Sequence, residues 1–278
     1  MPAYPTPDAA LIDAAGRPHQ PVGDAARIVS LVPSITELLF DLDLGNSVVG
    51  RTAFCVHPKG QVRRARSVGG TKQVNLAKLR RLEPTHVIVN IDETPRSLAD
   101  DLAALGMEVV VTHPIEVEDN SGLFRLMGGL FGRQAAAEIL CRRLDAALEA
   151  LVEAARTLPE QRVIYLIWKD PWMTVSPETY ISRMLALVHW RTVLAGEASV
   201  RYPALDLDED VLAGCERVLF SSEPFPFTER HLQAFRDAFP AHADKAAMID
   251  AQMVSWYGSR AIAGLRYLRL LAVPGQMR

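Results

Sequence analysis

The sequence predicts an α/β protein with two similar lobes, each built on a mostly parallel sheet, joined by one long backbone helix. Three observations predict this fold. Short apolar runs alternate with amphipathic helical patterns from residue 27 onward. A single long helical pattern, residues 134–157, divides the chain, and the order of patterns before it returns after it. Alternating strands and helices are typical of parallel sheets with right-handed crossovers.

The first lobe begins with residues 28–32, a nearly continuous apolar run that predicts a buried parallel strand. Pro33 ends the strand, and Ser34 and Glu37 have the spacing of a capping box, so a helix is expected to begin at Ser34. Its apolar face has the i, i+3, i+4, i+7 spacing of an amphipathic helix. That face comprises Ile35, Leu38, Leu39 and Leu42.

The rest of the first lobe repeats the same alternation. Strands are expected at residues 48–50, 86–90 and 108–112, with a short helix before Pro84 and another over residues 97–105. Residues 120–131 and 134–157 then form two consecutive helices, the second about 36 Å long at 1.5 Å per residue.

The second lobe repeats the pattern. A strand over residues 162–168 leads through a loop to Ser176 and Pro177, which are expected to start a helix. Further strands (217–223, 246–250) and helices (229–239, 259–271) follow. The predicted division is a flexible arm at 1–26, an N-terminal lobe at 27–118, a helical linker at 119–158 and a C-terminal lobe at 159–278.

Composition excludes several classes of protein. A net charge of −3 over 278 residues gives no electrostatic reason to expect nucleic acid as a partner. No apolar run approaches the roughly 18 residues that span a bilayer. Three widely spaced cysteines argue against a disulfide framework. The N-terminus lacks a basic start followed by an apolar stretch, so we expect a cytoplasmic protein, or a periplasmic one if the true start lies upstream.

Ligands bind at the carboxyl ends of strands in open parallel sheets, and polar and aromatic residues gather there in this sequence. Trp172, Trp256 and Tyr257 follow predicted strands and are expected to bind a large ligand, because aromatic residues line such pockets. Trp168 ends a strand and is expected to pack. The predicted ligand-binding residues are Phe54, His57, Lys72, Asn90, Trp172, Met173, Tyr202, Glu223, Trp256, Tyr257 and Arg260.

Enzyme and metal motifs are absent from the sequence. It has no G-x-S-x-G, Walker A, G-x-G-x-x-G, H-E-x-x-H or C-x-x-C motif. His57 could reach the metal centre of a bound ligand, or it could be a loop histidine bonded to backbone. Arg260 could bind a polar ligand or pair with a surface acid. An enzyme would need a titratable pair, for which Asp170 and Glu223 are the candidates.

Several motifs together resemble a known family, the helical-backbone binding proteins for cobalamin, heme and iron–siderophores of ABC transporters (the Fe/B12 periplasmic-binding domain, class III). The opening motif is residues 27–37, RIVSLVPSITE. The others are Val68-Gly69-Gly70-Thr71 before Asn75-Leu76, Leu82-Glu83-Pro84 before Val87-Ile88-Val89, residues 171–176 and Tyr202-Pro203. Residues 221–227 and 255–260 look closest to the cobalamin-binding-like branch.

The resemblance implies two rigid lobes with little hinge motion and a ligand held by aromatic side chains in the cleft between them, without catalysis or a catalytic cofactor. The ligand would be cobalamin or a related ferric chelate. Phe54 matches the aromatic residue of the family's first-lobe loop, and Trp172 or Met173 matches that of the second-lobe loop. Tyr202 matches the aromatic residue before the docking helix.

The sequence departs from the family at a docking position. Family members resemble one another in carrying a glutamate on each lobe for an ABC permease; Glu209 occupies one such position, but Ala77 occupies the other. Two binding functions therefore stay open: a transporter's substrate-binding protein, and a cytoplasmic carrier or sensor of metal chelates without a permease. An enzyme acting on such a ligand is a third. We expect a monomer.

Overall fold

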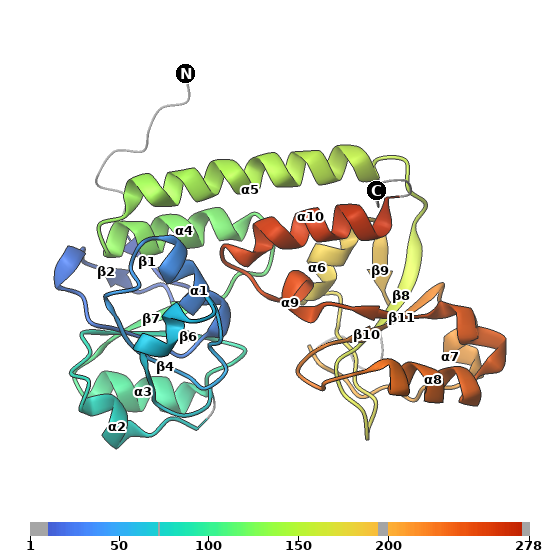
Figure 1. The fold of residues 1–278 in the computed structure, drawn as a ribbon, viewed down its shortest axis with the longest axis horizontal. Coiled ribbons are helices and arrows are strands. Elements are labelled where there is room, and N and C mark those ends of the chain that lie inside the picture. The colour runs from blue at the N-terminus through green and yellow to red at the C-terminus, as the bar shows by residue number, and fades with distance from the viewer. Residues whose placement is uncertain (1–10, 72, 194–199, 274–278) are drawn as a thin grey trace. The chain divides into compact units, whose positions relative to one another are not determined.

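The computed structural model describes residues 11–71, 73–193 and 200–273 and has the predicted α/β fold (Figure 1). The chain divides into two compact units. Unit 1 comprises Met1–Pro114 and Glu118–Arg142, and unit 2 comprises Ile115–Val117 and Arg143–Arg278. Among the described helices, none is both long enough and apolar enough to cross a membrane.

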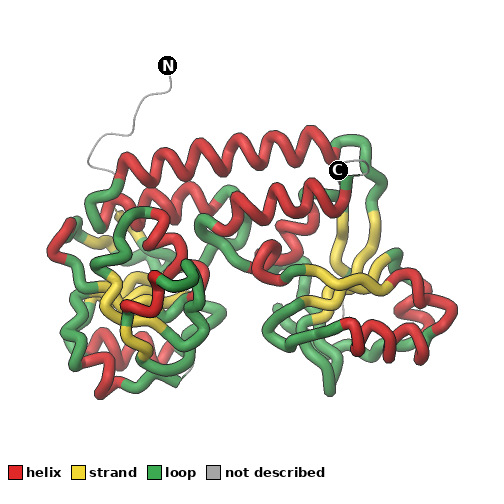
Figure 2. Tube along the Cα trace, in the orientation of Figure 1, coloured by secondary structure: helices red, strands yellow, loops and turns green. Residues whose placement is uncertain are grey.

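The boundary between the units falls within the long helix α5 (Gln134–Ala155), which has 22 residues (Figure 2). Unit 1 therefore includes the start of α5 and unit 2 includes its end. The predicted helical linker, residues 119–158, is thus divided between the two units. The predicted cleft between the lobes stays a prediction.

Unit 1 is built on a five-stranded sheet of order β5-β4-β3-β6-β7, in which every pair is parallel. Its strands are β3 (Ile28–Ser30), β4 (Val48–Arg51), β5 (Arg66–Ser67), β6 (His86–Asn90) and β7 (Glu108–Thr112). Its helices are α1 (Pro33–Asp41), α2 (Leu76–Arg80), α3 (Arg96–Ala104) and α4 (Asp119–Leu130), with short 3₁₀ turns at Gly23–Ala25 and Gln61–Arg64.

Helix α1 begins one residue earlier than predicted. Pro33 is its first residue, and no side chain caps it. Ser34 is buried, and its hydroxyl has no hydrogen-bond partner among the described residues. The predicted capping box is therefore wrong. The fixed φ of proline suits the first helical position, where its missing N–H costs nothing.

The predicted flexible arm is wrong for residues 11–26. Strand β1 (Leu11–Ile12) pairs antiparallel with β2 (Pro18–His19), and this hairpin covers the edge strand β7. Asp13 is buried and accepts hydrogen bonds from the backbone N–H groups of Ala15, Arg17 and Val111. Another neighbour of the Asp13 carboxylate is His19, whose Nε2 lies 3.1 Å from Asp13 Oδ2. On its other side, His19 Nδ1 lies 2.6 Å from Glu108 Oε1. Residues 1–10 of the predicted arm lie outside the described residues.

Unit 2 has a parallel four-stranded sheet of order β11-β10-β8-β9. Its strands are β8 (Gln161–Leu166), β9 (Trp190–Thr192), β10 (Arg217–Ser221) and β11 (Ala246–Ile249). Its other helices are α6 (Tyr180–Ala186), α7 (Glu209–Ala213), α8 (Glu229–Ala238), α9 (Ala251–Ser255) and α10 (Arg260–Ala272), with a 3₁₀ helix at Pro240–Lys245.

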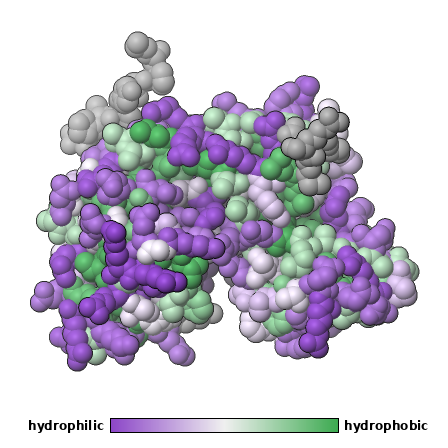
Figure 3. Space-filling model, viewed as in Figure 1, coloured by the Kyte–Doolittle hydropathy of each residue, from purple (hydrophilic) through white to green (hydrophobic). Residues whose placement is uncertain are grey.

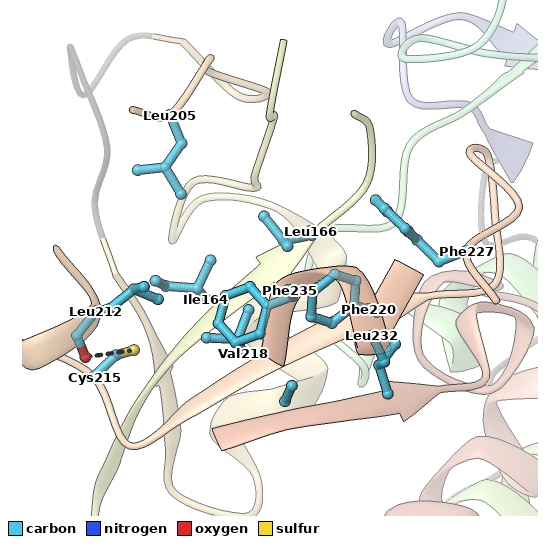
Figure 4. Close-up of a cluster of buried hydrophobic side chains, with 11 residues drawn as sticks. Ile164, Leu166, Leu205, Leu212, Cys215, Val218, Phe220, Phe227, Leu232 and Phe235 are labelled. Carbon is cyan, nitrogen blue, oxygen red and sulfur yellow. Dashed lines mark hydrogen bonds between the residues drawn. The ribbon is translucent and has the colours of Figure 1, made fainter. Parts of the chain in front are cut away.

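Two faces of the unit 2 sheet are covered by different helices. Figure 1 shows α8 on one side and α9 and α10 on the other. The core on the α8 side includes Phe220 of β10 and Phe235 of α8 (Figure 4). The predicted helix start at Ser176 is wrong, because α6 begins at Tyr180, and the Thr179 hydroxyl caps it by accepting from the Ser182 N–H.

Candidate functional site

Phe54 is the most exposed of the predicted site residues of unit 1 that the structure describes. It follows β4, and 61% of its surface is exposed. A Cβ added to Gly70 would lie 3.5 Å from Phe54 Cε2, so the ring lies beside the turn made by Gly69 and Gly70. Lys72, predicted on this same turn, lies outside the described residues.

Cys55 anchors the loop that carries Phe54 and His57. Its thiol is buried and accepts a hydrogen bond from the hydroxyl of Thr36 at 3.0 Å, and lies 3.2 Å from the hydroxyl of Thr52. Burial raises the pKa of the Cys55 thiol, so this cysteine is held as an unreactive thiol. His57 is half-buried two residues further on. Its role as a metal ligand stays a prediction.

Asn90 holds the turn after β6. Its side chain is buried, donates to the Thr112 carbonyl at 3.0 Å and accepts from the Asp92 N–H at 2.8 Å. These contacts use its amide to join β6, β7 and the following loop. Ligand binding by Asn90 stays a prediction.

Three predicted site residues of unit 2 lie on paired segments. Met173 pairs with Trp168 and with Ala204, and the Leu205 N–H donates to the Trp172 carbonyl at 2.9 Å. Backbone hydrogen bonds therefore hold the loop that carries Trp172 and Met173 beside the segment that follows the exposed Tyr202.

The Trp172 ring rests on a cluster of aromatic residues. It stacks on Phe227 with ring centroids 6.1 Å apart and meets the edge of Phe220 at 6.3 Å. The ammonium of Lys169 lies 5.5 Å from the centre of the Trp172 ring. Trp172 is therefore half-buried in the loop after β8 and packs against the core of unit 2.

Trp168 is an aromatic residue that was expected to pack. The structure leaves 41% of it exposed, with its ring against the edge of Phe225 at 5.5 Å. Strand β8 ends at Leu166, so Trp168 lies in the loop. The signal available in the sequence was the polar run Lys169-Asp170 directly after it.

Glu223, Trp256 and Arg260 form a second cluster in unit 2. The Trp256 Nε1–H donates to Glu223 Oε1 at 2.5 Å, and the Arg260 guanidinium lies 5.6 Å from the centre of the Trp256 ring. Trp256 and Tyr257 are each only 8% exposed, and Tyr257 packs against Tyr180. Both rings are therefore packed inside unit 2. Their role in ligand binding stays a prediction.

The carboxylates considered for catalysis have separate partners. Asp170 is exposed and pairs with Lys169 at 3.0 Å, whereas Glu223 bonds to Trp256. Among the described residues, no group of three or more histidine, cysteine or acidic side chains could hold a metal ion.

The two docking positions differ as the sequence indicates. Glu209 is the first residue of α7, and its exposed carboxylate lies 2.9 Å from His242 Nε2. Ala77 lies exposed in α2, a short helix capped by the Asn75 side chain.

The face of the molecule shown in Figure 3 is largely hydrophilic, with scattered apolar residues.

Parallel sheets that carry aromatic loops at their strand ends are features of binding proteins, and the chain belongs to the periplasmic binding protein family, whose model matches residues 28–209. An uncharacterized ABC transporter substrate-binding lipoprotein of Bacillus subtilis is 28% identical over 181 residues, 62% of this chain and 56% of that protein. The chain thus spans little more than half the length of this relative.

A vitamin B12-binding protein of Yersinia pseudotuberculosis is 27% identical over 206 residues, 74% of this chain and 73% of that protein. Among solved structures, the vitamin B12 binding protein BtuF of Vibrio cholerae has a TM-score of 0.77 at 18% identity, covering 91% of this chain and 99% of its own. The heme-binding protein RhuT of Roseiflexus has a TM-score of 0.75 at 21% identity, covering 88% and 97%. These structures confirm the predicted fold.

Proposed function

We propose that this protein binds a metal chelate of the corrinoid or heme class, without catalysis, as the substrate-binding protein of an ABC-type transporter. The observation that carries the proposal is the exposed aromatic side chains beside the strand ends of each unit. These exposed residues are Phe54 in unit 1, and Trp168 and Tyr202 in unit 2. Large flat ligands bind to such rings through their apolar faces.

The family supports a binding function over an enzymatic one. The relatives named for vitamin B12 favour a corrinoid as the ligand, and the heme-binding neighbour shows that the same fold serves another metal chelate. A permease would dock at Glu209, whose carboxylate is exposed. Because Ala77 has no carboxylate, docking in unit 1 would need other side chains.

Replacing Phe54 by alanine is expected to weaken the binding of cyanocobalamin about tenfold, because a ring that covers the ligand's apolar face contributes roughly 1.4 kcal/mol. Isothermal titration calorimetry measures the change. The fold is expected to stay intact, since the side chain is 61% exposed.

Val152→Ala is the matched control, because this exposed apolar residue lies on α5, away from the strand ends. It is expected to bind as the unmodified protein does. If the Phe54 and Val152 variants bound cyanocobalamin with equal affinity, Phe54 would not contribute to the binding site.

A further inference from the structure

Unit 2 contains an open hollow at the carboxyl ends of β10 and β11, and Trp168, Trp172 and Tyr202 are not among its lining residues. Its volume is about 540 Å³. We call it the acidic hollow. It is lined by Ser222, Glu223, Met248, Ile249, Asp250, Gln252 and Tyr267, so none of its described lining residues carries a positive charge.

Two carboxylates supply the acceptors of the acidic hollow. Glu223 accepts from Trp256 at 2.5 Å and from the Gln252 amide at 3.4 Å. Asp250 Oδ1 accepts from the Gln252 N–H at 3.0 Å and caps α9, while its Oδ2 has no donor among the described residues. A carboxylate offers about four acceptor positions, so both groups keep capacity for a ligand.

Hydroxyl groups supply donors at the same place. The Tyr267 hydroxyl accepts from the Asp250 N–H at 3.1 Å, and the Ser222 hydroxyl accepts from the Ala251 N–H at 2.9 Å. Both keep their own hydrogen for donation. Burial raises the pKa of Tyr267, so this donor stays protonated at neutral pH.

A third hydroxyl, that of Tyr165, lies close to several of the groups that line the acidic hollow. Tyr165 is fully buried, and its hydroxyl has no hydrogen-bond partner among the described residues. Its neighbours in β8, Ile164 and Leu166, belong to the core on the α8 side, so the alternation of a strand directs Tyr165 to the opposite face.

Burial raises the pKa of Tyr165 far above its ordinary value, and the carboxylate of Glu223 raises it further. The neighbouring Ser221 hydroxyl lowers this pKa, while Tyr267 and Asp250 raise it. The Tyr165 hydroxyl therefore lies within electrostatic reach of three lining groups. A buried hydroxyl that lacks a well-formed hydrogen bond costs free energy, so a further polar group close to Tyr165 would be stabilising.

We propose that the acidic hollow binds a neutral hydrogen-bonding group at the edge of the ligand, a primary amide above all. An amide NH₂ donates to the Glu223 and Asp250 carboxylates, and its carbonyl accepts from the Ser222 and Tyr267 hydroxyls. A carboxylate in the same place would face two negative charges. This inference rests on the proposed function and narrows it to chelates whose periphery carries amides.

The test compares two probes that differ in one group. Cyanocobalamin carries peripheral amides, and mild hydrolysis converts one amide to a carboxylate. We expect the unmodified protein to bind the amide form at least about tenfold more tightly than the carboxylate form, as like-charge repulsion requires. Asp250→Asn is expected to reduce this preference to about threefold or less, measured by calorimetry.

The variants preserve the fold. Asparagine caps a helix as well as aspartate does, so α9 keeps its cap in Asp250→Asn. Glu223→Gln keeps an oxygen for Trp256 and is expected to act in the same direction. Asp244→Asn, which removes an exposed acid of unit 2 outside the acidic hollow, is the control and is expected to leave the preference unchanged.

Each contrary outcome has a distinct meaning. Equal binding of the two cobalamin forms, or an equal effect of Asp250→Asn on both, would overturn the acidic hollow as an amide site. Binding of heme but not cyanocobalamin would overturn it too, because heme presents carboxylates, while chelate binding as a function would survive. Failure to bind cyanocobalamin and heme alike would overturn the proposed function itself.

Discussion

Phe220→Ala is expected to lower the free energy of unfolding by about 4 kcal/mol, because truncating a buried phenylalanine removes its contacts and leaves a cavity. Phe220 is fully buried in the centre of unit 2. The edges and faces of Trp172, Phe227 and Phe235 meet it at centroid distances of 6.3, 5.2 and 5.5 Å. Chemical denaturation followed by circular dichroism measures the loss.

Phe220→Ala is also expected to affect the partly exposed Trp172. Trp172 loses one of the rings beneath it, so its fluorescence and the affinity for cyanocobalamin should both change. Phe239→Ala is the control: this partly buried ring at the end of α8 contacts the cluster from its border and should cost about 1–2 kcal/mol. Equal losses from the two variants would contradict the central position assigned to Phe220.

Gly264→Ala is expected to cost about 3 kcal/mol of stability, at the upper end of what overpacking does. A Cβ at this position of α10 would overlap the carbonyl oxygen of Met253 in α9 and would lie 2.9 Å from Met184 Cε in α6. A methionine side chain can move, but a backbone carbonyl cannot move without shifting α9.

Gly122→Ala in α4 separates this packing effect from helix propensity. A Cβ there would meet nothing within 4 Å, so the substitution should stabilise the protein by up to about 1 kcal/mol. Thermal unfolding of both variants makes the comparison. If Gly264→Ala were as stable as Gly122→Ala, the close approach of α10 to α9 would be wrong.

The strands were predictable because their apolar runs are local signals. Residues 28–32 and 86–90 are nearly continuous apolar stretches, as expected of strands covered on both faces, and β3 and β6 form there with every residue buried. Helix starts were less predictable. Ser34 and Ser176 are good capping residues, but Pro33 and Thr179 occupy the places where the chain enters its helices.

The hairpin over residues 11–19 could not be predicted because its partners are distant in sequence. Asp13 reads as a break in a weak apolar stretch, yet it is buried because it accepts the N–H of Val111, nearly a hundred residues later. Polar residues that satisfy distant backbone groups leave no periodic signal.

The exposure of the predicted aromatic residues was predictable only in part. Strand ends carry exposed aromatics as expected, with Phe54 and Tyr202 among them. Trp168, which was expected to pack, is exposed, whereas Trp256, which was expected to bind a ligand, is buried. Their exposure depends on where β8 ends and on the Glu223 contact, which sequence spacing does not reveal.

The most direct test of chelate binding is a calorimetric titration of the protein with cyanocobalamin, aquocobalamin and heme, with the visible spectrum recorded in parallel. We expect saturable one-site binding of a corrinoid with a micromolar or lower dissociation constant. This corresponds to a binding free energy of about −8 kcal/mol or more favourable. A spectral shift of aquocobalamin that His57→Ala abolishes would assign His57 to the cobalt. The absence of saturable binding for all three chelates would contradict the proposed function.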